Sequence, residues 1–222
     1  MKRLLQLVLI TITIGQLCAF GQTEQVTAAE QGLHVFLKKV PEASKSSYGF
    51  DRDDLLEDAY LGRPFNLYTI TPARLADFKS GDSVNSVISQ TSLWYFPVML
   101  HDKIKTILVV DKIQDKWSAV SLGYTPLARE IEEIIRQWPE SKGFNPKIII
   151  VFQADKYLFT IPEIDGYNLT FIDDHYEPEI NKGCRKKPLN TTDTDSSRYS
   201  TLVEISKTIE LLKPLVESSI NE

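Results

Sequence analysis

The densest group of side chains that could do chemistry is formed by Asp173, Asp174, His175 and Glu177. Carboxylates suit a hard cation, and a histidine suits a transition metal. A metal site needs further ligands at a diagnostic spacing, and no second pair of ligands follows this group. A solvated loop is therefore the preferred interpretation, and a secreted hydrolase or metal-dependent enzyme that uses the loop from Asp173 to Glu177 is the alternative.

A nucleophile and base could be built from Cys184 and His175, because an imidazole can form and orient a thiolate. Both residues fall in one irregular polar region, and no oxyanion-hole pattern accompanies them. His101 stands beside Asp102 in a predicted turn, and His34 lies on a predicted helix. The chain contains neither G-x-S-x-G nor H-E-x-x-H. The sequence therefore predicts no catalytic residue, no metal ligand and no cofactor.

Charge and composition describe an acidic globular protein. The 222 residues are 42% hydrophobic and 25% charged, with a formal net charge of −5 and a pI near 5.4. The basic cluster Arg185, Lys186 and Lys187 is interpreted as a solvated loop rather than a phosphate site. Because there is no concentrated basic face to displace counterions, we expect no nucleic-acid partner.

The N-terminus has the pattern of a secretory signal peptide over residues 1–21. Lys2 and Arg3 precede an apolar stretch from Leu4 to Leu17, and a small-x-small pattern then allows cleavage before Gln22. The stretch is shorter than the ~20 residues that a membrane-spanning helix needs and includes polar residues. We therefore expect a secreted or periplasmic protein with no transmembrane anchor after cleavage.

Lipidation at Cys18 is the alternative fate of this segment. Leu17 is bulky at a position where lipoprotein signals usually carry a small residue, which favours plain cleavage. The mature chain would then keep one cysteine, Cys184, and no internal disulfide.

The stretch from Leu93 to Trp138 organises the predicted fold. Three strands, Leu93 to Leu100, Ile104 to Ile113 and Trp117 to Leu122, are separated by short polar turns and predict an antiparallel meander. Thr125 is then predicted to cap an amphipathic helix whose first helical residue is Pro126. We expect this helix to pack on the meander because its apolar side chains share one face.

Flanking elements complete an α+β fold with a central antiparallel sheet of five or six strands. Helices are predicted over Gln22 to Val40, from Asp51 to Tyr60, after Thr71 and Pro72, and from Thr201 onward with a kink near Pro214. Further strands are predicted over Arg63 to Ile70, Ile148 to Phe152 and Tyr157 to Ile161. A loop is predicted over Glu42 to Ser47, and a polar connection over Gly81 to Gln90.

The predicted division of the chain has five parts. They are the signal peptide over 1–21, an N-terminal helical segment over 22–62, an α+β core domain over 63–162, an irregular polar loop over 163–200 and a C-terminal helix over 201–222.

Six aromatic residues on the predicted strands are the remaining candidates for binding. They are Trp94, Tyr95, Phe96, Trp117, Tyr157 and Phe159. Core packing is the preferred interpretation, and the alternative is that an uncovered sheet face presents several of them as a binding surface.

The segments PFNLYTI, LWYFPVML, WSAVSLG, IIRQWPESKGFNP and VFQADKYLFTIPE resemble uncharacterised secreted proteins of Bacteroidetes-type bacteria. This resemblance covers about Leu61 to Glu163 and implies no active site. By strand spacing alone, the helix and sheet are also similar to small α+β modules found as propeptides and peptidase-inhibitory domains of secreted proteases. That similarity implies a protease-associated role and leaves the flanking helices unexplained.

Together these patterns predict a non-enzymatic binding or interaction module of the cell envelope. Its predicted partner is a protein or a glycan outside the cytoplasm. The hypothesis depends on the signal peptide, on the lack of a nucleophile or metal motif in the sequence, and on the aromatic strands.

Overall fold

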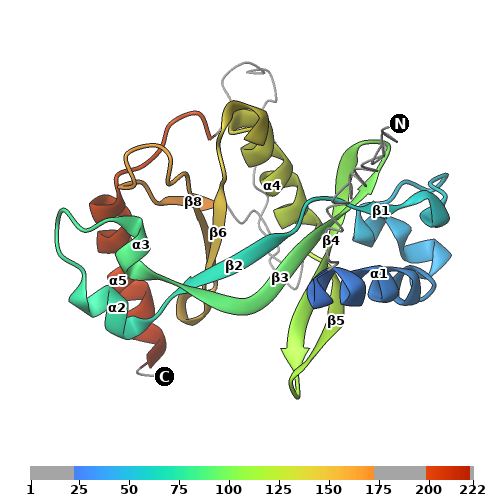
Figure 1. Cartoon of the computed structure of the whole chain (residues 1–222), viewed down its shortest axis with the longest axis horizontal. Helices are drawn as coiled ribbons and strands as arrows, with labels where there is room; N and C mark the ends of the chain where they lie inside the picture. The colour runs from blue at the N-terminus through green and yellow to red at the C-terminus, as the bar shows by residue number, and fades with distance from the viewer. Residues whose placement is uncertain (1–22, 173–198, 221–222) are drawn as a thin grey trace, which may run out of the picture.

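The computed structural model describes residues 23–172 and 199–220. Within them the chain is α+β, with one eight-stranded sheet and helices packed on both of its faces (Figure 1). The group from Asp173 to Glu177, Cys184, the basic cluster at 185–187 and the predicted signal peptide with Cys18 all lie outside the described residues.

The predicted meander is confirmed and forms one end of the sheet. Its strands are β3 (Ile88–Leu100), β4 (Lys103–Ile113) and β5 (Lys116–Gly123), paired antiparallel in that order. Two tight turns join them, and both central residues of each turn have positive φ, His101 and Asp102 in the first, Gln114 and Asp115 in the second. This conformation matches the right-handed twist of the paired strands.

The other half of the sheet continues from β2 (Phe65–Ile70) through β6 (Lys147–Val151) and β7 (Lys156–Thr160) to β8 (Thr170–Ile172). The short strand β1 (Tyr60–Leu61) pairs with β3 off this path. β2 and β6 are parallel, whereas every other pairing within the described residues is antiparallel. The predicted α+β fold with a central antiparallel sheet is therefore confirmed, and the sheet as a whole is mixed, mostly antiparallel.

Side-chain alternation along the strands divides the core between the two faces of the sheet. On one face Ile107 and Val109 of β4 pack with helix α4 (Thr125–Gln137). On the other face Leu108 and Val110 pack with helix α1 (Glu24–Leu37). Figure 1 shows α1 at the β5 end of the sheet, with α4 near the middle.

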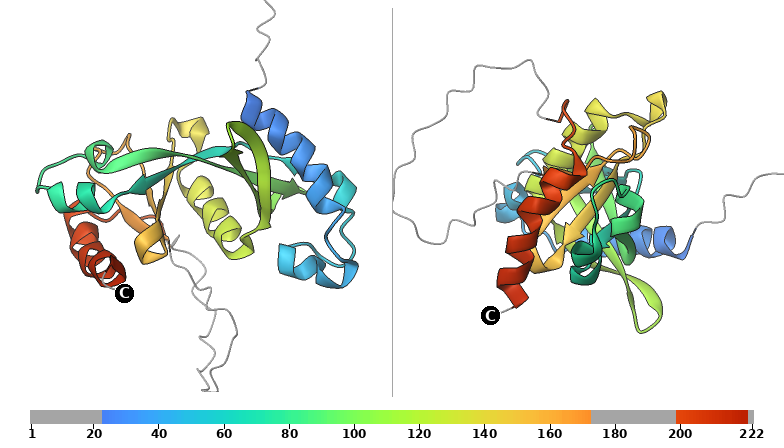
Figure 2. Two further views of the ribbon diagram at one scale, coloured as in Figure 1. Left: turned by 90° about the horizontal axis from the view of Figure 1, so that it is seen from below. Right: turned by 90° about the vertical axis from the view of Figure 1, so that its left-hand side faces the viewer.

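Helix α5 (Ile205–Ile220) covers the opposite end of the sheet. Ile149 and Val151 of β6 face this helix, whereas Ile148 and Ile150 face the α4 side. Its buried stripe consists of Ile205, Ile209, Leu212 and Val216, and Pro214 lies inside the helix. The views in Figure 2 show α1 and α5 at opposite ends of a strongly twisted sheet.

The starts of helices α2 and α4 agree in part with those predicted from the sequence. Helix α2 (Pro72–Asp77) is capped as expected, because the Thr71 hydroxyl accepts a hydrogen bond from the backbone N–H of Arg74 at 3.4 Å. Helix α4 starts one residue earlier than its predicted first helical position, with Tyr124 as its N-cap in the left-handed region.

Three segments differ from the prediction. The helix expected from Asp51 to Tyr60 is wrong, because this segment holds only the 3₁₀ turn η2 (Leu56–Asp58) before β1. The loop expected over 42–47 forms the 3₁₀ helix η1 (Glu42–Tyr48).

The polar connection expected over 81–90 holds the short helix α3 (Val84–Val87) and the start of β3. Val84 and Val87 are both buried there. Two further 3₁₀ turns, η3 (Glu140–Lys142) and η4 (Phe152–Ala154), flank β6, and β8 lies within the segment expected to be an irregular loop.

Candidate functional site

The two histidines that the structure describes do not form a catalytic or metal site with other ligands. His34 lies on α1, and His101 lies in the β3–β4 turn, with its side chain 73% exposed. Among the described residues, no three side chains of histidine, cysteine, aspartate or glutamate converge closely enough to hold a metal ion. His101 does, however, stand at the edge of a cluster of buried charges.

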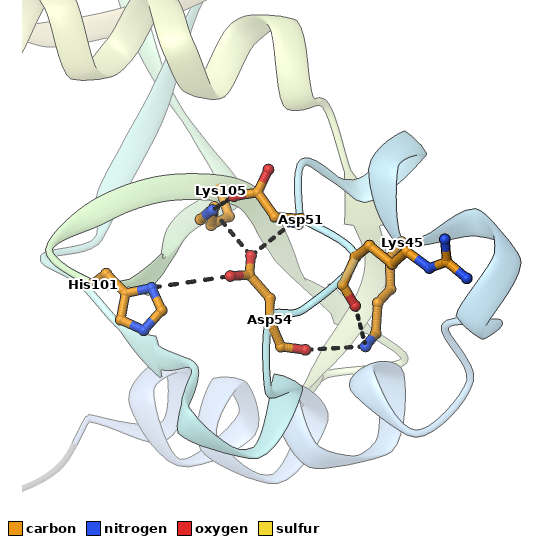
Figure 3. A network of polar contacts seen from close by, with 6 residues as sticks. Lys45, Asp51, Asp54, His101 and Lys105 are labelled. Atoms are coloured by element: carbon orange, nitrogen blue, oxygen red, sulfur yellow. Dashed lines mark hydrogen bonds and ion pairs between the residues drawn. The ribbon is translucent and has the colours of Figure 1, made fainter.

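This buried charge cluster is built from Asp54, Lys105 and Lys45, and the carboxylate of Asp51, which is 81% exposed, joins it from the surface (Figure 3). The Asp54 carboxylate is 7% exposed. It forms an ion pair with the Lys105 ammonium at 3.0 Å and accepts a hydrogen bond from the backbone N–H of Asp51 at 2.7 Å. The Asp51 carboxylate binds the same ammonium at 2.7 Å. His101 Nδ1 lies 3.9 Å from Asp54, too far for a hydrogen bond.

The environment changes the acidity of both central groups. Burial would raise the pKa of Asp54, but the Asp51 backbone hydrogen bond and the Lys105 ammonium outweigh it, so that this pKa lies below its ordinary value. Burial would likewise lower the pKa of Lys105, but the two carboxylates outweigh it and raise this pKa. The pair is therefore charged at neutral pH.

Lys45 completes the cluster from η1. Its ammonium donates to the carbonyl oxygens of Asp54 at 3.0 Å and Arg52 at 3.4 Å, and it pairs with Glu42 at 2.9 Å. The three N–H groups of this ammonium are thus used within the protein. The cluster fastens the non-helical segment between η1 and β1 to strand β4, which is an architectural role.

The six strand aromatics divide into two groups. Tyr95, Phe96, Tyr157 and Phe159 are buried in the core, as preferred. The hydroxyl oxygens of Tyr95 and Tyr157 lie 2.9 Å apart there. The pKa of Tyr95 is raised, mainly by its burial and to a smaller extent by the neighbouring Tyr157.

Trp94 and Trp117 are partly exposed instead. Each of them lines a surface hollow on the described part of the chain. These two hollows and one beside η1 can be compared by their size and by whether their polar side chains already have partners in the protein.

The hollow beside Trp94 measures about 140 Å³ and is also lined by Asn66, Tyr68, Arg63 and Lys147. Its two cations already have partners. Arg63 pairs with Glu140 at 2.5 Å, and Lys147 donates to Asn85 at 3.0 Å while its ammonium lies 4.9 Å from the centre of the Tyr68 ring. This volume is below the ~300–1,000 Å³ typical of small-molecule sites.

A hollow of about 520 Å³ lies beside η1 and is lined by Glu42, Ala43, Lys45, Ser46 and Arg52. It is large enough for a ligand, but it has no aromatic side chain. Its most buried cation, Lys45, uses its donors inside the charge cluster. This hollow therefore offers little fixed chemistry to a ligand.

The third hollow, here named the Trp117 hollow, measures about 350 Å³ and lies between α1 and the β4–β5 turn. It is lined by Glu24, Thr27, Ala28, Gln31, Asp115, Lys116 and Trp117. The four helical residues are spaced i, i+3, i+4 and i+7, so that they form one stripe along α1.

A close approach of α1 to β5 sets the shape of this hollow. A Cβ atom added to Gly32 would lie 2.1 Å from the Cβ of Ala119, so only glycine fits at this crossing. Gly32 follows Gln31 on the helix, and Ala119 lies two residues after Trp117 on the strand. The contact therefore holds the polar stripe of α1 beside the indole.

The polar side chains of the Trp117 hollow are largely free to bind. Asp115 pairs with Lys112 at 3.3 Å. Within the part of the chain that the structure describes, the side chains of Glu24, Thr27, Gln31 and Lys116 make no hydrogen bond or ion pair with another residue. Sequence reasoning identified Trp117 but missed the stripe of α1, because only the apolar stripe of this helix was used to predict it.

Comparisons with protein-family models, with curated proteins and with solved structures find no match to the chain. In residues 23–172 and 199–220 there is no helix that is both long and apolar enough to span a membrane.

Proposed function

We propose that the chain is an extracytoplasmic, non-enzymatic binding module of the cell envelope, and that its ligand binds in the Trp117 hollow. The observation that carries this proposal is a set of polar side chains that have no partner among the described residues and that line a hollow with one partly exposed tryptophan. A large aromatic surface combined with a few convergent polar groups is typical of ligand sites.

The location outside the cytoplasm is supported by the sequence. Lys2, Arg3 and the apolar stretch after them have the order of a signal peptide. To test it, the full chain with a C-terminal tag is produced in its native host, and the intact mass of the exported protein is measured. Cleavage before Gln22 is expected. A mass that includes Cys18 with attached lipid would indicate an envelope lipoprotein, and uncleaved protein in the cytoplasm would overturn the location.

Binding is tested with the same exported protein. Immobilised wild-type, Trp117→Ala and Trp94→Ala proteins are incubated with envelope extract and culture fluid, and retained proteins and glycans are identified by mass spectrometry. We expect one stoichiometric ligand that Trp117→Ala loses and Trp94→Ala keeps. Equal retention by all three proteins, or no retention by any of them, would contradict binding in the Trp117 hollow.

A further inference from the structure

The Trp117 hollow has a size and an aromatic lining residue that suit a small ring-shaped ligand. Its volume of about 350 Å³ lies near the lower end of the ~300–1,000 Å³ range of small-molecule sites. The face of an indole ring carries partial negative charge. It therefore attracts the C–H groups on the flatter face of a sugar ring, which carry partial positive charge.

The polar side chains around the indole favour a neutral partner. Glu24 offers acceptors, Lys116 offers donors, and Thr27 and Gln31 offer both, while Asp115 is paired with Lys112. An anion would face the Glu24 carboxylate, and a cation would face the Lys116 ammonium. Sugar hydroxyl groups both donate and accept hydrogen bonds, so they can use the whole set without an unpaired charge.

The neighbouring sheet edge is less suited to an extended peptide. Strand β5 ends the sheet, and an added strand would pair with its free backbone groups. However, Val109 pairs with Ser121 and Val110 with Ala119, which leaves Val120 as a bulged residue in the middle of β5. A bulge interrupts the regular row of N–H and C=O groups that a peptide strand needs.

We infer that the Trp117 hollow binds a neutral saccharide of one or two rings, with one sugar ring stacked on the indole of Trp117. This inference rests on the proposed function and names the ligand class for the same hollow.

The first measurement is binding of the full exported protein to a printed array. The array carries neutral oligosaccharides that end in glucose, galactose, mannose or N-acetylglucosamine, beside spots that end in a uronic acid. Binding to one neutral group is expected. Preference for the uronic acids would overturn the inference, because it would require an anion site.

The second measurement locates the bound sugar. The chain has three tryptophans, and their indole N–H signals are assigned by NMR with single tryptophan variants. Titration with the preferred sugar should shift the Trp117 signal and leave the signal of Trp138, whose indole N–H donates to the Tyr199 carbonyl at 3.0 Å. A shift confined to Trp94 or Trp138 would overturn the inference.

Two variants test the contacts against matched controls. Trp117→Ala should weaken binding about tenfold or more, and Trp94→Ala should leave it unchanged. Gln31→Ala changes an exposed residue without threatening the fold and should weaken binding several-fold, whereas Gln25→Ala on the same helix should not. Unchanged affinity in both hollow variants would contradict the inference.

The outcomes separate this inference from the proposed function. If no sugar binds while a protein ligand is retained and lost in Trp117→Ala, the saccharide is wrong and the binding module stands. If neither a sugar nor any envelope ligand depends on Trp117, both proposals fail.

Discussion

The buried charge cluster and the Trp117 hollow contain similar kinds of side chain but use them differently. In the cluster, Asp54, Lys105 and Lys45 satisfy one another and the backbone around them. In the hollow, Glu24 and Lys116 have no partner among the described residues. A charged side chain is a candidate for ligand binding in any sequence. Whether it can bind a ligand depends on whether the fold already pairs it with another group.

The physical reason is the cost of removing a charge from water. A buried carboxylate is tolerated only when hydrogen bonds and an opposite charge replace its hydration. Once these contacts are made, the group has little left to offer a ligand. The hollow is open to solvent, so its polar groups remain hydrated and can exchange water for a ligand.

The largest expected effect of a substitution is on the cluster. Asp54→Ala should lower the free energy of unfolding by about 3 kcal/mol, because it leaves the Lys105 ammonium with only one of its two carboxylates. Urea denaturation measures this loss. The neighbouring Asp53→Ala is the matched control, since Asp53 is exposed, and it should change stability by less than about 0.5 kcal/mol. Equal losses for the two variants would contradict the architectural role.

A smaller loss is expected where the helix meets the sheet at the hollow. Gly32→Ala should cost about 2 kcal/mol, because the new methyl group collides with Ala119 and pushes α1 away from β5. Thermal unfolding gives the measurement, with Gln31→Ala as the control on the same helix. If Gly32→Ala were as stable as the wild type, the close crossing would not set the position of the helix.

The contribution of the cluster to stability should depend on pH, because the pKa of Asp54 is lowered. The ordinary pKa of the group is 3.8, so its contribution to stability is complete above that value and is lost as the pH falls toward the lower folded-state pKa. Asp54→Asn removes this contribution. The difference in stability between wild type and variant should therefore shrink on acidification below pH ~4, as measured by urea denaturation across that range. A constant difference would argue against the lowered pKa.

The smallest effect is expected at the rim of the cluster. His101→Gln should change stability by less than about 0.5 kcal/mol, because the imidazole is exposed and lies 3.9 Å from Asp54. Chemical denaturation at neutral pH is sufficient for this comparison. A loss as large as that of Asp54→Ala would make His101 a member of the cluster.

The sequence predicted the fold best where local patterns determine structure. The meander and α4 were predictable because their strands, turns and amphipathic helix follow one another directly along the chain. The segment from Asp51 to Tyr60 was mispredicted as a helix, since its apolar spacing fits one. In the fold, the contacts of Asp54 and Lys45 hold it in a non-helical conformation, and such tertiary contacts override local preference.

The site was predictable only in part. Trp117 was identified as a candidate because it is an aromatic residue on a predicted strand. The polar residues beside it come from α1, far away in the sequence, and the packing of α1 on β4 and β5, which is closest at Gly32 and Ala119, brings them together. Conversely, Tyr95 and Phe96 gave the same signal as Trp94, their neighbour on β3, and are buried, because burial depends on what packs against each position of the strand.

The parallel pairing of β2 with β6 has a consequence for the order of folding. Tyr68 pairs with Ile149, and the entire meander and α4 lie between them along the chain. Antiparallel hairpins close short loops, whereas this pairing must close a long one and gains no contacts until it does so. We therefore expect the meander with α4 to become ordered early, and the union of the two halves of the sheet at β2 and β6 to be the late, rate-limiting event.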